Sequence, residues 1–215
     1  MNHLESLLEL ALAKARNERE LQPFFKQYPL LIRNAFNVWA WNYVDVLPEF
    51  QFGSDFRADF LILSADSGCW HATLVELKSH RSRLFTKQGL PSRALNTALR
   101  QLDDWELWLK RYENLFRASL SKHFESKNVI AFCSPVDRHR MAETEITDPR
   151  TRLDLKYRIL MGRRNELGIE DQERRGLLSA KGRDIVTYDR LIDVAQTLDA
   201  AAQKVPSNQP GLADR

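Results

Sequence analysis

Cysteine is scarce in this chain of 215 residues, which contains only Cys69 and Cys133. Two cysteines are too few for a disulfide scaffold and are typical of a reducing compartment. No apolar run approaches the ~20 residues that cross a bilayer. The first sixteen residues mix acidic and basic side chains with leucines, which is not the pattern of a signal peptide. We therefore expect a cytoplasmic protein with no membrane partner.

A strong charge of one sign is also missing, because 32 Lys and Arg against 29 Asp and Glu leave a net charge of +3. This balance excludes a histone-like protein that binds nucleic acid through bulk charge. Basic residues nevertheless gather locally, in the stretch 150–183 and in an acid-free segment that contains Arg81, Arg83, Lys87 and Arg93. Such segments either contact phosphates or simply solvate an exposed face.

Several motifs of common enzyme classes are absent from the sequence. No glycine-rich loop precedes a lysine in the Walker form, so an ATPase has no support. The five histidines show no zinc spacing, and neither cysteine has a partner motif for nucleophilic catalysis. We expect His80 to lie in an exposed loop, although it could touch a phosphate. No internal repeat is present.

Hydrophobic residues make up 43% of the chain, which is enough for a core of ordinary size. The pattern predicts one α/β domain over residues 1–203, with N-terminal helices (2–35), a central core (40–134) and C-terminal strand–helix units (150–203). We expect a disordered tail at 204–215. The expected helices are 2–20, a short one from Pro23, 92–112, 166–178 and 189–202; the expected strands are 44–52, 58–63, 71–77, 128–133, 155–161 and 184–188.

The hairpin predicted from strands 58–63 and 71–77 carries the most informative residues. Glu76 and Lys78 are two apart at the end of the second strand, so their side chains share a face. Asp59, on the neighbouring strand, supplies a second carboxylate. Two converging carboxylates suit Mg²⁺ or Mn²⁺, and Lys78 could position a water molecule or offset phosphate charge. The alternative is a salt bridge at a sheet edge, between Glu76 and either Lys78 or Arg81.

Gln101 is a polar residue on the apolar stripe of the long helix predicted at 92–112. The stripe follows helical spacing and consists of Ala94, Ala98, Gln101, Trp105, Trp108 and Tyr112. Read by itself, Gln101 would bond the backbone at the edge of the core.

The Asp59…Glu76-x-Lys78 arrangement resembles the core of PD-(D/E)xK nucleases. In RecB-like members, a glutamine followed four residues later by an aromatic closes the active site, and Gln101 with Trp105 matches that pattern. The order of segments resembles the Shedu family of bacterial anti-phage nucleases, in its C-terminal nuclease domain, over roughly residues 16–195. The matching segments are NERELQPFFKQYPLLI, PEFQFGSDFRADFLIL, TLVELKS, LPSRALNTALRQLDDW, ILMGRR and DIVTYDRL. In two places the chain departs from the pattern, with Ala58 where many members have proline and Ser79–His80 where a proline often follows the lysine.

The resemblance implies a restriction-endonuclease-like α/β core, a mixed central sheet flanked by helices. It implies that Asp59, Glu76 and Lys78 are catalytic, that Asp59 and Glu76 hold Mg²⁺ or Mn²⁺, and that Gln101 assists. Glu18 matches a family glutamate on the N-terminal helix, although Glu20 is close by. A homo-oligomer is implied as well.

We therefore expect a magnesium-dependent DNA endonuclease or exonuclease in anti-phage defence. Its phosphate-backbone contacts would come from Arg81, Arg83, Lys87 and Arg93. One alternative is a non-catalytic DNA-binding or assembly module that retains the nuclease fold. A small-molecule phosphohydrolase is a third hypothesis, for which nothing in the sequence builds a pocket.

Overall fold

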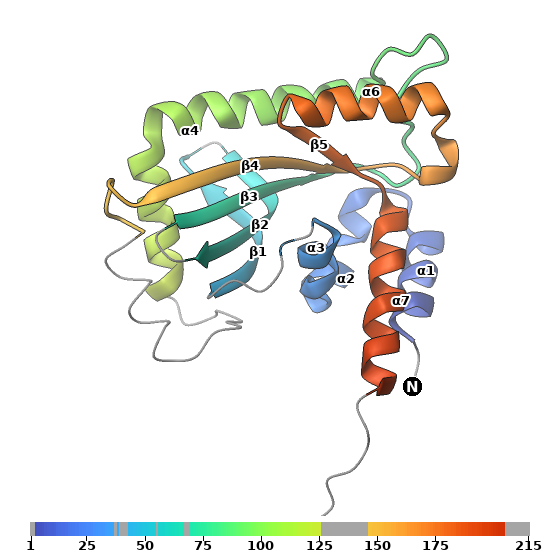
Figure 1. The fold of residues 1–215 in the computed structure, drawn as a ribbon, viewed down its shortest axis with the longest axis horizontal. Coiled ribbons are helices and arrows are strands. Elements are labelled where there is room, and N and C mark those ends of the chain that lie inside the picture. Colours follow the sequence, from blue (N-terminus) through green and yellow to red (C-terminus); the bar gives the residue numbers. More distant parts are fainter. Residues whose placement is uncertain are drawn as a thin grey trace, which may run out of the picture.

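The computed structural model describes residues 3–36, 38, 43–54, 56–66, 69–125 and 146–204, and it is an α/β structure with a mixed sheet between helices (Figure 1). Its elements are α1 (Leu4–Lys14), the 3₁₀ turn η1 (Glu18–Glu20), α2 (Gln22–Gln27), α3 (Pro29–Ala35), β1 (Tyr43–Phe52), β2 (Phe56–Asp66), β3 (Cys69–Leu77), α4 (Arg93–Glu125), β4 (Arg152–Leu160), the 3₁₀ turn η2 (Arg164–Glu166), α6 (Ile169–Ala180), β5 (Arg183–Val186) and α7 (Tyr188–Lys204). The strand expected at 128–133 lies outside the described residues, as does the expected tail after Lys204.

The five strands follow one another across the sheet in chain order, β1-β2-β3-β4-β5. The first three form an antiparallel meander, which confirms the predicted hairpin between β2 and β3. After α4 the chain returns parallel to β3, and β5 is parallel to β4. The carboxyl ends of β3, β4 and β5 therefore meet at one edge of the sheet.

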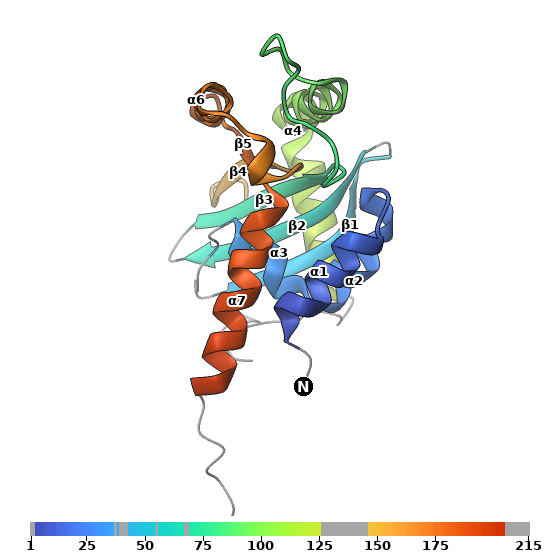
Figure 2. The ribbon, with the colours of Figure 1, turned by 90° about the vertical axis from the view of Figure 1, so that its right-hand side faces the viewer.

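Helices bury both faces of the sheet, as the two perpendicular views show (Figures 1 and 2). Alternate residues of β2 point to opposite sides: Leu61 and Leu63 pack in the cluster that contains α4, whereas Phe60 and Ile62 pack with α1, α2, α3 and α7. A strand buried on both faces reads as a continuous apolar run. This explains the sequence ADFLIL, in which Asp59 interrupts an otherwise hydrophobic segment.

The N-terminal helix is shorter than the predicted 2–20, because α1 ends at Lys14. The backbone is extended at Ala15, and a new turn, η1, starts after Asn17. The Asn17 side chain accepts hydrogen bonds from the amides of Arg19 and Glu20, which caps the new turn. Glu18 therefore lies in this turn and not on the N-terminal helix, so this part of the prediction is wrong.

The long helix begins as predicted, with Ser92 Oγ accepting a hydrogen bond from the Leu95 amide at 3.2 Å. It continues past residue 112, but Tyr112 itself has non-helical angles (φ −132°, ψ 37°) and bends the helix, as Figure 1 shows. Ala98 and Trp105 of the predicted stripe are buried, whereas Tyr112 is exposed. None of the described helices is both long enough and apolar enough to cross a membrane.

Gly162, two residues after the end of β4, has a backbone conformation and close surroundings that favour glycine. Its φ is +68°, and a Cβ there would lie 2.6 Å from Leu84 Cδ1 and 2.8 Å from the Ser82 carbonyl oxygen. We expect Gly162→Ala to lower the free energy of unfolding by about 2–4 kcal/mol, measured by urea denaturation. The control is Gly176→Ala in α6, where a Cβ meets nothing within 4 Å. It should raise the same quantity by about 0.5–1 kcal/mol, and effects of equal sign would contradict the explanation.

Candidate active site

Asp59 lies where strands β2 and β3 stop pairing. The pairing of the two strands extends to Phe60 opposite Val75. Beyond this point the Asp59 side chain, in place of the β2 backbone, bonds to β3. Its Oδ2 accepts a hydrogen bond from the Leu77 amide at 2.7 Å, and its Oδ1 accepts one from Gln22 Nε2 at 2.6 Å. The carboxylate is therefore fixed from β3 and from α2.

Glu76 is almost completely buried, with 5% of its surface exposed. Lys78 Nζ donates to Glu76 Oε1 at 2.5 Å, and Gln101 Nε2 donates to Glu76 Oε2 at 2.7 Å. The salt bridge considered in the sequence is therefore present with Lys78, whereas Arg81 donates to the Ala13 carbonyl at 3.2 Å. Gln101 therefore bonds the Glu76 carboxylate from α4, the helix that faces it.

These groups line one cavity of about 520 Å³, which we call the carboxylate cavity. Its lining residues are Glu18, Arg19, Gln22, Glu49, Arg57, Asp59, Glu76, Leu77, Lys78 and Gln101. They come from η1, α2, the first three strands, the segment after β3 and α4. The structure thus brings together all five residues proposed from the sequence as catalytic.

The choice between Glu18 and Glu20 follows from the cap of η1. Glu20 accepts hydrogen bonds from the Arg16 amide and from Asn17 Nδ2, each at 3.0 Å, so its carboxylate is used locally. Glu18, two residues earlier, lines the carboxylate cavity. Breaking the helix at residue 14 is what brings Glu18 to this position.

Burial and like charge dominate the electrostatics of the carboxylate cavity. The pKa of Glu76 is raised to about 7, mainly by burial and also by the negative charges of Asp59 and Glu18, while Lys78 opposes the shift. Burial also raises the pKa of Asp59, against the hydrogen bonds from Leu77 and Gln22 and the charge of Lys78. Clustered carboxylate oxygens are hard ligands that favour Mg²⁺ or Mn²⁺. Asp59 and Glu76, with Glu18 beside them, could hold such an ion.

The four basic residues proposed to contact DNA lie outside the carboxylate cavity. Arg81 lines a separate cavity with Arg163, and Arg83 and Lys87 line another beside α6. Arg93 is exposed at the start of α4.

Five cavity residues were missed in the sequence: Arg19, Gln22, Glu49, Arg57 and Leu77. Arg57 had a usable signal, because it precedes Asp59 by two residues on the same strand, the spacing that placed Glu76 and Lys78 on one face. Gln22 had none, since only the packing of α2 against the sheet brings it to Asp59.

His80 is buried, with 5% of its surface exposed, so the expected exposed loop is wrong at this residue. Its ring packs edge-on against Tyr188, with ring centroids 5.7 Å apart. The Tyr188 hydroxyl donates to the Lys78 carbonyl at 3.0 Å. The segment after β3 is therefore packed under α7, and this packing fixes the backbone that carries Lys78.

The raised pKa of Glu76 predicts how stability depends on pH in the absence of divalent ions. The unfolded side chain titrates near 4.5 and the folded one near 7, so between these values the folded state holds an extra proton. The free energy of unfolding should therefore fall as the pH rises from 5 to 8. Relative to Glu76→Gln, we expect wild type to lose about 2–3 kcal/mol over this range.

Urea denaturation in EDTA at both pH values measures this difference. Glu49→Gln is the control, because the hydrogen bond from Lys26 lowers the pKa of Glu49 and places its titration below this range. A difference between wild type and Glu76→Gln that does not change with pH would contradict the prediction.

A family model described as Shedu protein SduA, C-terminal, matches residues 15–192. A search of the curated proteins found no match. The matched range contains every residue of the carboxylate cavity and all five described strands. Because the match covers most of the chain and its whole sheet, the chain belongs to the Shedu SduA C-terminal family.

Proposed function

We propose that this chain is a metal-dependent DNA nuclease with a restriction-endonuclease-like PD-(D/E)xK core that acts in bacterial defence against phage. The observation that carries the proposal is the position of Glu76, which is held between Lys78 and Gln101 in the cavity that also contains Asp59. Membership of the Shedu family supports both the nuclease class and the role in defence.

The placement of these residues on the sheet supports the PD-(D/E)xK assignment. The single carboxylate is on the second strand of the meander, and the Glu-x-Lys pair is at the end of the third. The amide comes from the helix that leads to the first parallel strand. This placement agrees with the order of Asp, Glu-x-Lys and glutamine on which the resemblance rests, and so supports the proposal.

Asp59 and Glu76 are the proposed ligands of Mg²⁺ or Mn²⁺, with Glu18 as a further oxygen donor. The donor set fits such an ion, because four carboxylates line the cavity, and burial together with the negative charges of Asp59 and Glu18 raises the pKa of Glu76 to about 7. A bound ion would supply Lewis-acid polarisation of the scissile phosphate and activation of a water molecule.

The protein side chains supply orientation and charge. Gln101 fixes Glu76 Oε2, while Gln22 and the Leu77 amide fix both oxygens of Asp59, so the carboxylates are held before substrate arrives. Lys78 reaches the cavity from the end of β3. Its ammonium would position the attacking water and offset the negative charge that builds on the phosphate as the water oxygen bonds to phosphorus and the P–O bond breaks.

The proposed DNA contacts combine two groups of cations. Arg19 and Arg57 line the carboxylate cavity and would contact phosphates next to the cleaved bond. A second group, outside the cavity, would contact the backbone further away: Arg81, Arg83, Lys87 and Arg93. Phosphate contacts of this kind position the duplex without reading its sequence.

Lys78→Ala tests the catalytic assignment. We expect cleavage of DNA in Mg²⁺ to fall at least about 100-fold, because a positioning and charge-stabilising group is lost. DNA affinity, measured by gel shift in EDTA, should change by less than about threefold. The control is Lys181→Ala, which removes an exposed lysine after α6 and should leave cleavage unchanged. Equal cleavage by wild type and Lys78→Ala would overturn the proposal.

Metal dependence separates a nuclease from a non-catalytic DNA-binding module of the same fold. For a nuclease, Mn²⁺ should raise the Tm of wild type but not of Asp59→Asn, since only the native form binds the ion. EDTA should abolish cleavage. Salt-sensitive DNA binding without cleavage, and without a rise in Tm in Mn²⁺, would instead identify the non-catalytic module.

A further inference from the structure

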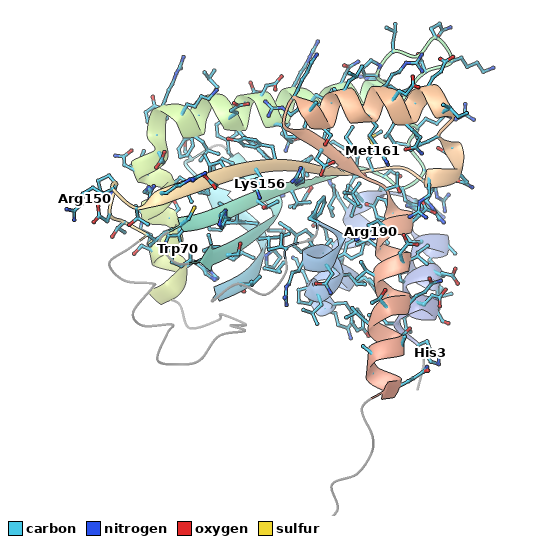
Figure 3. All side chains as sticks on the ribbon, in the orientation of Figure 1. His3, Trp70, Arg150, Lys156, Met161 and Arg190 are labelled. Atoms are coloured by element: carbon cyan, nitrogen blue, oxygen red, sulfur yellow. The ribbon has the colours of Figure 1, made fainter. Side chains whose placement is uncertain are left out.

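Three chemically different side chains meet at the opposite end of β3 from the carboxylate cavity: Cys69, His71 and Asp154. One ligand atom from each lies within 4.8 Å of the others. The parallel register places Asp154 of β4 directly opposite His71 of β3. Figure 3 labels Trp70 at this end of the sheet, far from Met161, which follows β4 at the other end.

The cluster lies on the other face of β3 as well as at its other end. Cys69 and His71 alternate with Trp70, which packs in the cluster that contains α4. Glu76 is five residues beyond His71 on the same strand, a distance of about 16 Å at 3.3 Å per residue. Its side chain faces α4, where Gln101 bonds it. The two groups therefore cannot share a ligand ion.

The contacts within the cluster orient the carboxylate. His71 Nδ1 lies 3.5 Å from Asp154 Oδ2, and Arg152 Nε donates to Asp154 Oδ1 at 2.8 Å. The Cys69 thiol is 3.4 Å from the Trp70 carbonyl and also contacts Asp154. Burial opposes ionisation of Asp154, but the hydrogen bonds from Arg152 and Cys69 lower its pKa overall, so the carboxylate is charged at neutral pH. Arg152 fixes one oxygen and leaves Oδ2 directed at His71.

We propose that Cys69, His71 and Asp154 form a binding site for Zn²⁺. A thiolate, an imidazole and a carboxylate are the three side-chain types that Zn²⁺ binds, whereas Mg²⁺ disfavours sulfur. Each of the three is partly exposed, which gives an ion a path to the site. Arg152 bonds Asp154 Oδ1 and so holds the carboxylate in place, as hydrogen-bonding partners of metal ligands commonly do. Bound there, Zn²⁺ joins the first residues of β3 to β4 and stabilises their pairing.

Cobalt substitution tests this site with a readout that does not depend on nuclease activity. Co²⁺ bound through a thiolate gives a sulfur-to-cobalt charge-transfer band in the near ultraviolet, which oxygen ligands in the carboxylate cavity do not give. We expect wild type, reduced with a non-thiol reductant, to develop this band with one Co²⁺ per chain. Zn²⁺ should abolish the band by displacing Co²⁺.

Matched variants assign the band to the proposed ligands. Cys69→Ser should remove it, and Asp154→Asn or His71→Gln should weaken Co²⁺ binding at least tenfold. Cys133→Ser and Glu76→Gln should keep the band at wild-type affinity. Circular dichroism of each variant without metal checks its fold. Absence of the band in folded wild type, or its persistence in Cys69→Ser, would overturn the proposal, and neither result bears on the nuclease.

Discussion

A carboxylate buried at the end of a strand must be compensated, and the compensation of Glu76 determines how the rest of the molecule is arranged. Lys78 offsets its charge from the same strand face, and Gln101 bonds its second oxygen from the helix across that face. Removing either partner would leave a buried polar group unsatisfied, which costs more than the bond itself contributes. Gln101 reaches Glu76 because α4 crosses the sheet next to the end of β3. Trp105, one turn further along α4, is fully buried.

The end of β3 is fixed by elements far away in the chain. The Lys78 amide donates to the Leu160 carbonyl of β4 at 2.9 Å, and its carbonyl accepts from the Tyr188 hydroxyl at the start of α7. Asp59 completes the arrangement by bonding the Leu77 amide where the hairpin stops pairing. Helix α2, the meander and the C-terminal strand–helix units thus all contribute to one short segment of backbone.

Local periodicity was sufficient to predict the features that depend on one element or one hairpin. The pairing of β2 with β3, the shared face of Glu76 and Lys78 and the start of the long helix near residue 92 all follow from spacing or from a single side chain. The break after α1 could not be predicted from the apolar stripe, because the Asn17 side chain competes with the helix for its own backbone. The burial of His80 was also missed, since it results from contact with α7 in a part of the chain more than a hundred residues away.

The alternation of β3 explains how one strand can serve two kinds of ligand chemistry. Residues with even numbers, from Trp70 to Glu76, face the cluster that contains α4, whereas Val75 and Leu77 pack with the N-terminal helices and α7. Whether a residue of β3 has an even or odd number therefore decides the face of the sheet on which its side chain lies. Its position along the strand decides whether it lies near the amino or the carboxyl end. The carboxylates of the carboxylate cavity gather at the carboxyl end of β3, and Cys69 and His71, with Asp154 of β4, gather at its amino end. In the proposed Zn²⁺ site a thiol and an imidazole accompany the Asp154 carboxylate, whereas the carboxylate cavity offers carboxylate oxygens, so the two proposed sites favour different ions.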